Sequence, residues 1–110
     1  AQKDFTEAIR LNPDNPAAYN NLAWLLATCS NPTYRNGEQA ISSAKQACEL
    51  LGWKSVDAFD TLAAAYAETG QFVEAIKWQN KAIASAAEES KQKLTDRLKL
   101  YQANKPYRTH

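Results

Sequence analysis

The chain has 110 residues and a formal net charge of +1, which fits one domain and argues against a strongly charged nucleic-acid or membrane-surface binder. Alanine occurs 20 times, against two valines and four isoleucines, and this balance favours helices over strands. A hydrophobic share of 45% excludes a disordered tail. The longest apolar runs have six residues, whereas a membrane-spanning helix needs about 20.

The two cysteines, Cys29 and Cys48, are too few for a disulfide framework and lack the spacing of a metal or redox motif. We expect small buried thiols, with a Cys29–Cys48 bridge as the alternative in an oxidising compartment. The chain opens at Ala1, without Met, in a helical pattern, so we expect a fragment of a longer protein. The compartment stays unknown, with a cytoplasmic one favoured.

Six helices are expected in chain order. The first three cover residues 2–11, 16–29 and 37–51. Pro13 follows the first, Asn15 and Pro16 form a typical helix start for the second, and Gly52 ends the third. The loop 30–36 between the second and third helices is rich in turn-forming residues.

The last three helices are expected at residues 55–69, 72–86 and 88–103. Ser55 is a candidate N-cap and Gly70 a terminator. Leu94, Leu98 and Tyr101 form an apolar stripe on the sixth helix, which we expect to cap the preceding helices. The basic-aromatic tail at 104–110 either docks back onto the domain or leads into whatever follows.

Two patterns recur along the chain at helical spacing. Tyr19-x-x-Leu22-Ala23-x-x-Leu26 resembles Phe59-x-x-Leu62-Ala63-x-x-Tyr66, and Ala40-Ile41-x-x-Ala44-x-x-Ala47 resembles Ala75-Ile76-x-x-Gln79-x-x-Ala82. A unit of about 34 residues, with insertions in the loops, explains the offsets between them. The alanines of these patterns allow antiparallel helices to approach closely.

This helix-turn-helix unit resembles the tetratricopeptide repeat (TPR) over roughly residues 4–87, with Ala44 and Gln79 departing from its aromatic position. Stretches such as LAWLLATC, YRNGEQAI and RLKLYQANKPYR look like the TPR modules that are frequent in large planctomycete bacterial proteins. The resemblance implies an all-α, right-handed α-solenoid of antiparallel helix pairs, with about six helices including a C-terminal capping helix. It divides the single domain into a half repeat (1–13), two repeats (16–51 and 55–86), the capping helix (88–103) and the tail (104–110).

Nothing in the sequence predicts catalysis. The only histidine is His110, which removes histidine-based acid-base and nucleophile pairs, and the three glycines are isolated, so no phosphate loop exists. We therefore expect no enzyme, no cofactor and no metal site.

In the family that the chain resembles, the first helix of each repeat lines a concave face. The implied function is a protein–protein interaction scaffold that binds a peptide or protein partner there. Trp24 is either an aromatic anchor for a peptide or packing between repeats. The groove carries Asp60 and Glu68, which suits a basic or mixed peptide. The expected partner-binding residues are Asn20, Trp24, Thr28, Asp60, Ala64, Glu68, Gln92, Asp96 and Lys99.

The alternative function is a structural spacer or self-association module in a larger protein. The truncated half repeat could expose Phe5 and Ile9 and pair with a second copy. Residues 88–110 carry a net charge of +3, but nucleic-acid binding through them is the weakest reading, because such a helix is usually a solvated face. We expect neither a nucleic acid nor a membrane as partner.

Overall fold

The computed structural model describes residues 2–109, and the side chains from Asp4 onward, as α-helices with one short 3-10 helix and no strand. The elements are α1 (Gln2–Leu11), α2 (Pro16–Thr28), η1 (Pro32–Tyr34), α3 (Gly37–Leu50), α4 (Val56–Glu68), α5 (Phe72–Ser85) and α6 (Glu88–Gln102). Each boundary lies within one residue of its predicted place. The all-α solenoid class is confirmed, whereas the division into repeats stays a prediction.

Local signals explain where the helices begin and end. The side chain of Asn15 accepts hydrogen bonds from the first backbone N–H groups of α2, and Ser55 does the same for Ala58 in α4. Gly52 and Gly70, at φ +70° and +80°, terminate α3 and α4 in the left-handed conformation that glycine adopts without strain.

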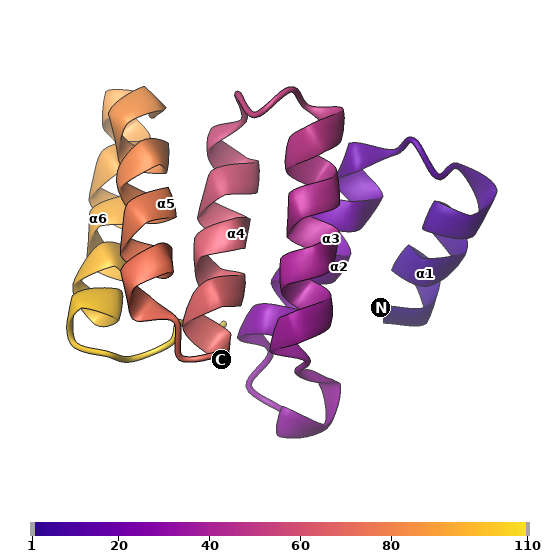
Figure 1. Cartoon of the computed structure of the whole chain (residues 1–110), viewed down its shortest axis with the longest axis horizontal. Helices are drawn as coiled ribbons and strands as arrows, with labels where there is room; N and C mark the ends of the chain where they lie inside the picture. The colour runs from indigo at the N-terminus through magenta and orange to yellow at the C-terminus, as the bar shows by residue number, and fades with distance from the viewer. Residues whose placement is uncertain (1, 110) are drawn as a thin grey trace.

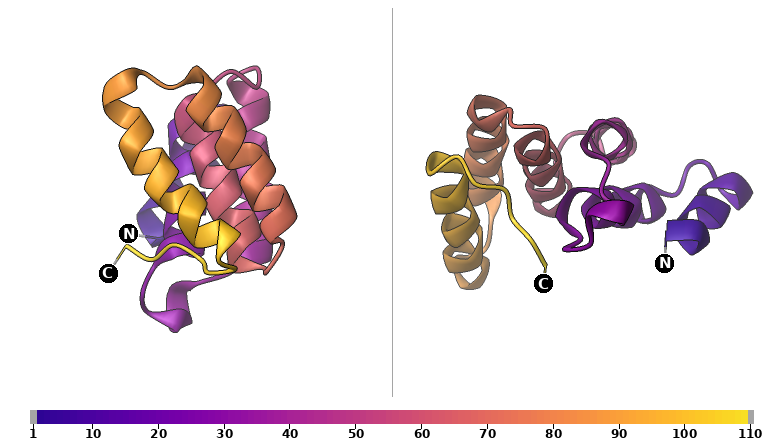
Figure 2. Two further views of the ribbon diagram at one scale, coloured as in Figure 1. Left: turned by 90° about the vertical axis from the view of Figure 1, so that its left-hand side faces the viewer. Right: turned by 90° about the horizontal axis from the view of Figure 1, so that it is seen from below.

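The helices stack as antiparallel neighbours along a curved row. α2 pairs with α3, α4 pairs with α5, and α6 lies against α5, while α1 packs on α2 at the other end (Figure 1). Seen from below, the row bends into an arc, and the last residues of the chain cross its inner side (Figure 2). The molecule measures 37 × 30 × 22 Å.

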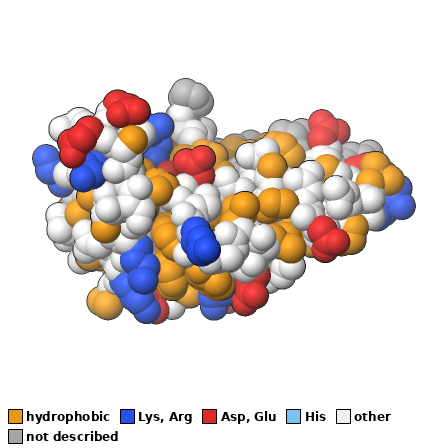
Figure 3. Space-filling model, turned by 90° about the horizontal axis from the view of Figure 1, so that it is seen from above, with side chains coloured by type: hydrophobic (Ala, Val, Ile, Leu, Met, Phe, Trp, Pro, Cys, Tyr) orange, Lys and Arg blue, Asp and Glu red, His pale blue; other side chains and the backbone are white. Residues whose placement is uncertain are grey.

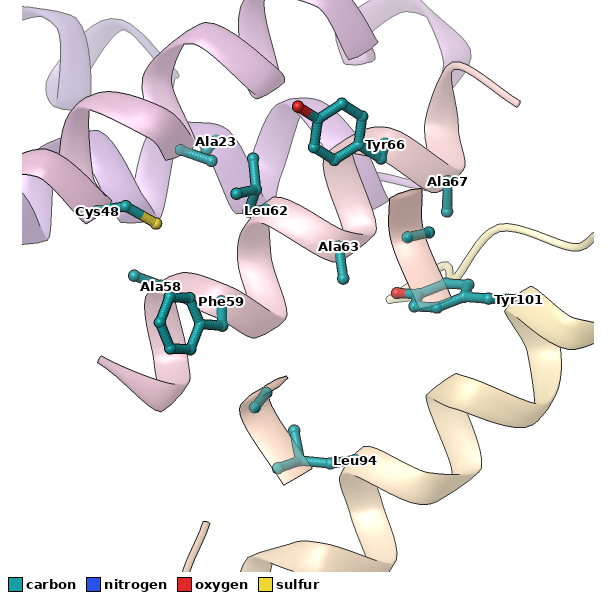
Figure 4. Packing of buried hydrophobic residues seen from close by; sticks show 13 residues of the cluster. Ala23, Cys48, Ala58, Phe59, Leu62, Ala63, Tyr66, Ala67, Leu94 and Tyr101 are labelled. Carbon is teal, nitrogen blue, oxygen red and sulfur yellow. The ribbon is translucent and has the colours of Figure 1, made fainter. Parts of the chain in front are cut away.

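Alanine fills the seams between the helices, as the sequence predicts. The six repeat-pattern alanines that we expect in the seams are each 0% exposed, so larger side chains there would cost about 1–3 kcal/mol each. These residues are Ala23, Ala40, Ala47, Ala63, Ala75 and Ala82. Figure 4 shows Ala23 and Cys48 on one side of α4, and Leu94 and Tyr101 of α6 on its other side.

Gln79 stands in α5 where the family pattern has an aromatic residue, and it is fully buried. Its Nε2 donates a hydrogen bond of 2.9 Å to the carbonyl of Leu94 in α6. This bond pairs the amide nitrogen and ties the capping helix to the stack, whereas the buried Oε1 has no hydrogen-bond partner among the described residues.

Both cysteines are free, which excludes the Cys29–Cys48 bridge in this structure. Cys48 is buried in the core as expected, but Cys29 is only partly buried because it follows the last turn of α2. Of the helices described for residues 2–109, none is long and apolar enough to cross a membrane.

Candidate functional site

Three helices that are not consecutive in sequence line one cleft on the inner side of the arc. We call it the inner cleft. Its cavity measures about 290 Å³. The lining residues are Asn20, Asn21 and Trp24 of α2, Asp57, Asp60 and Thr61 of α4, and Lys93 and Arg97 of α6. The first helices of the predicted repeats and the capping helix therefore share one surface.

Polar atoms without partners lie inside this cleft. The Oδ1 atoms of Asn20 and Asp60 are buried and accept no hydrogen bond within the described part of the chain. A buried acceptor that stays unpaired costs about 1–3 kcal/mol, so a water molecule or a partner's donor group that reaches these atoms would be favoured. An extended peptide offers such donors in its backbone N–H groups.

Arg97 is the central side chain of the cleft. Its guanidinium lies 4.9 Å from the ring centre of Trp24 and 4.7 Å from that of Tyr107. The two aromatic rings are 5.6 Å apart and tilted by 40°. A cation against two aromatic faces gains from both ring quadrupoles, so the guanidinium is stabilised between these rings.

The carboxylate of Asp60 neutralises the positive charge of Arg97. Its Oδ2 accepts a hydrogen bond of 2.5 Å from Arg97 Nη1, and both residues are only 8% exposed. Burial raises the pKa of Asp60, while the positive charge of Arg97 and a contact with Gln79 oppose the shift. Asp60 therefore holds Arg97 in place and offers no free negative charge to a partner.

Glu68, the second acidic residue expected in the groove, is also paired. Its Oε1 lies 2.7 Å from Nη2 of Arg108, and its Oε2 lies 3.4 Å from Nε of Arg35. Both carboxylates of the expected acidic groove are therefore paired with an arginine, and one of the arginines beside Glu68 belongs to the tail.

The sequence left open whether the tail docks back onto the domain or leads away from it. Up to residue 109, the last residue that the structure describes, the tail docks back. Tyr107 meets Trp24, and the backbone N–H of Thr109 donates a hydrogen bond of 2.9 Å to the carbonyl of Thr28. These contacts place residues 107–109 at the C-terminal ends of α2 and α4, next to the inner cleft (Figure 2).

The structure brings together Asn20, Trp24 and Asp60 in the cleft, and Thr28 and Glu68 beside the tail. Ala64 is different. It is 1% exposed and packs in a core cluster with Leu22 and Leu26, so it offers a partner no surface.

None of the three expected α6 residues, Gln92, Asp96 and Lys99, lines the inner cleft. Gln92 and Asp96 are exposed and hydrogen-bonded to each other at 2.8 Å. Asp96 lines a smaller cavity of about 210 Å³ with Lys93, Arg97, Leu100 and Tyr107. Lys99 is exposed and lines neither cavity.

Sequence reasoning missed Arg97, Tyr107 and Arg108 as site residues. Arg97 lies three residues after Leu94 and four before Tyr101, so it falls on the buried stripe of α6 rather than on its solvated face. An arginine on an apolar stripe is the signal that could have identified it, since a buried charge needs a partner.

The end of the molecule at which α2, α4 and α6 begin carries no surface patch of a single charge among its described residues. Where α2, α4 and α6 begin, hydrophobic side chains lie among scattered basic and acidic ones (Figure 3). Among residues 2–109, no group of three or more His, Cys, Asp or Glu side chains could hold a metal ion.

Comparison with known proteins finds similarity to a family model over part of the chain. Residues 5–41, from α1 to the start of α3, match the family model described as tetratricopeptide repeat. Such repeats generally mediate protein–protein interactions. No curated protein and no solved structure shows significant similarity to the chain.

Proposed function

We propose that this chain is a non-catalytic scaffold module that binds an extended peptide or protein segment in the inner cleft. The observation that carries the proposal is the convergence of α2, α4 and α6 on one cavity that holds buried, unpaired acceptors beside an aromatic ring. Trp24 supplies apolar area, and Asn20 supplies an acceptor for a peptide N–H. The proposal includes an accessory role beside other domains, as the predicted resemblance to planctomycete TPR modules would imply.

The test compares two exposed asparagines, of which one lines the cleft and the other does not. Asn21 is exposed on α2 inside the cleft, whereas Asn80 is exposed on α5 and does not line it. We expect Asn21→Arg to abolish capture of partners by the chain, and the matched variant Asn80→Arg to leave capture unchanged. Circular dichroism checks that both variants fold. Equal capture by both variants would refute the cleft as the binding surface.

A self-association module is the second candidate, and one observation favours it. Leu11 is 70% exposed at the end of α1, although Phe5 and Ile9 are partly covered by α2 rather than open as the sequence suggested. If this end pairs with a second copy, light scattering will show a mass that rises with concentration and falls to the monomer in Leu11→Lys. A monomer at every concentration contradicts pairing.

A further inference from the structure

We propose that the inner cleft, together with its rim at Thr28 and Glu68, recognises an extended peptide in which an aromatic residue is followed directly by arginine. In this chain, residues 107–109 occupy that site in cis. The inference rests on the proposed function and names the class of partner for it. Three contacts of the tail define which peptide features the site binds: an aromatic ring, a guanidinium group and a backbone N–H.

The aromatic position is defined by Trp24 and Arg97. Tyr107 stacks on Trp24 with the rings 5.6 Å apart, and the guanidinium of Arg97 lies against its face. Because Asp60 fixes Arg97 from behind, this surface is preformed. A flat aromatic ring fits it better than an aliphatic side chain, since only a ring gains from both stacking and the cation.

The arginine position is defined by Glu68 and the end of α2. Arg108 Nη2 lies 2.7 Å from Glu68 Oε1, while Nη1 lies 3.5 Å from the carbonyl of Ala27. The last carbonyls of a helix carry partial negative charge, so carboxylate and helix end attract the same guanidinium. A lysine has a compact ammonium group instead of a planar guanidinium with separate N–H groups, so it matches two acceptors of this kind less well.

The backbone position is defined by Thr28. Its carbonyl accepts hydrogen bonds from both the N–H and the hydroxyl of Thr109, at 2.9 and 3.2 Å. This carbonyl ends α2 and has no partner within the helix. A bound strand therefore supplies a backbone N–H one residue after its arginine.

The tail is built to exchange with such a peptide. α6 closes at Asn104, whose φ of +59° turns the chain sharply, and the backbone N–H of Lys105 bonds back to Leu100. Beyond that turn, residues 106–109 are all partly exposed and none is fully buried. Releasing them leaves the core clusters of α2 to α6 in place, with only Tyr107 leaving the edge of one.

The experiment opens the site within the full chain. Tyr107→Ala/Arg108→Ala removes both tail side chains, and an acetylated, amidated peptide Lys-Pro-Tyr-Arg-Thr is added as probe. Short tethers give effective concentrations of about 1 mM, so the wild-type tail competes strongly. We expect calorimetry to show at least tenfold tighter binding to the variant than to the wild type. No binding to the folded variant would overturn the proposal.

Control peptides and control variants distinguish specific recognition from non-specific binding. The peptides Lys-Pro-Ala-Ala-Thr and Lys-Pro-Tyr-Glu-Thr should bind the variant at least tenfold more weakly, because one lacks the ring and guanidinium and the other meets Glu68 with a like charge. Adding Glu68→Gln to the variant should weaken binding of the Tyr-Arg peptide, whereas adding Asn80→Arg should not. Equal affinity for all three peptides would refute the assigned chemistry.

A second release variant guards against loss of fold. Thr109→Pro removes the N–H that binds Thr28 while keeping Tyr107 and Arg108. We expect it to bind the probe several-fold more tightly than the wild type does. If both release variants are folded by circular dichroism and neither binds, the proposal fails.

A peptide library displayed against the release variant distinguishes this inference from the proposed function. Enrichment of aromatic-arginine sequences supports both. Enrichment of other sequences, lost in Asn21→Arg, refutes the inference and leaves the cleft as a binding site. A wild-type dimer that dissociates on Arg108→Ala would make a second copy the occupant and contradict a peptide partner.

Discussion

At the scale of single residues, the Asp60–Arg97 pair belongs both to the lining of the cleft and to the buried interior. Both side chains are about nine-tenths buried, with 12% and 10% of their surface exposed. Removing one partner of such a pair leaves a charge that neither water nor protein neutralises. A change at Asp60 therefore tests the fold before it tests binding, which a sequence pattern alone does not show.

We predict that Asp60→Ala lowers the free energy of unfolding by about 3–5 kcal/mol, because Arg97 stays buried without its carboxylate. The double variant Asp60→Leu/Arg97→Met should recover most of this loss, since two apolar side chains need no partner. Urea denaturation measures both. A double variant as unstable as Asp60→Ala would show that the pair is not the cause.

Cys48 gives stability a dependence on alkaline pH. Burial raises the pKa of its thiol from 9.0 to about 11. Between these values the unfolded chain loses the thiol proton while the folded chain keeps it, so stability falls as pH rises from 9 to 11. We expect the urea midpoint of the wild type to fall more steeply in this window than that of Cys48→Ala. Parallel pH profiles would contradict the assignment.

At the scale of helices, the contact between the start of α3 and the end of α4 depends on Gly37. A Cβ placed on Gly37 would lie 2.6 Å from Cγ2 of Thr69, closer than real contacts allow. Only a residue without a side chain lets the two helix ends meet without displacement.

Gly37→Ala should therefore cost about 1–3 kcal/mol of stability by overpacking. Gly37→Ala/Thr69→Ser should regain most of it, because serine lacks Cγ2 but keeps the hydroxyl that donates to the carbonyl of Tyr66. Thr69→Ser alone serves as the control in thermal denaturation. If the double variant is no more stable than Gly37→Ala, the clash lies elsewhere.

Sequence could predict the helices because their boundaries are set by neighbours in the chain. Asn15 and Ser55 cap within three residues, and Gly52 and Gly70 end helices through their own backbone conformation. Arg97 meets Asp60 across 37 residues, and no local pattern encodes that meeting.

The site was predictable only in part for the same reason. Helical spacing placed Asn20 and Trp24 on the inner side, but it also placed Ala64 there, which instead packs in the core with Leu22 and Leu26 of α2. The tail contacts join residues 81 positions apart, so they follow from the three-dimensional path of the chain rather than from periodicity.

At the scale of the whole molecule, burial is uneven along the row of helices. α4 lies in the middle, and all its residues from Ala58 to Ala67 are buried. α1 packs mainly against α2 at one end. Stacked helices of this kind are stabilised by each neighbour, so an end helix has fewer stabilising contacts than a central one.

Native-state hydrogen exchange should reveal this gradient. We expect the amides of α4 to exchange slowest, at the rate of global unfolding, and those of α1 to exchange fastest through local opening. Exchange measured residue by residue by NMR checks the order. Uniform protection from α1 to α6 would show instead that the chain unfolds as a single unit.

The bonds from Arg108 and Thr109 to the end of α2 close a loop of 81 residues, whereas the helix pairs form between neighbours in the chain. Contacts so distant in sequence form late, because the entropy of closing the loop is lost before they contribute. During synthesis on the ribosome, α2 and α4 emerge before residues 107–109 do. The newly made protein consequently passes through an interval in which the rim at Thr28 and Glu68 is vacant, and a partner present at that moment meets no competitor.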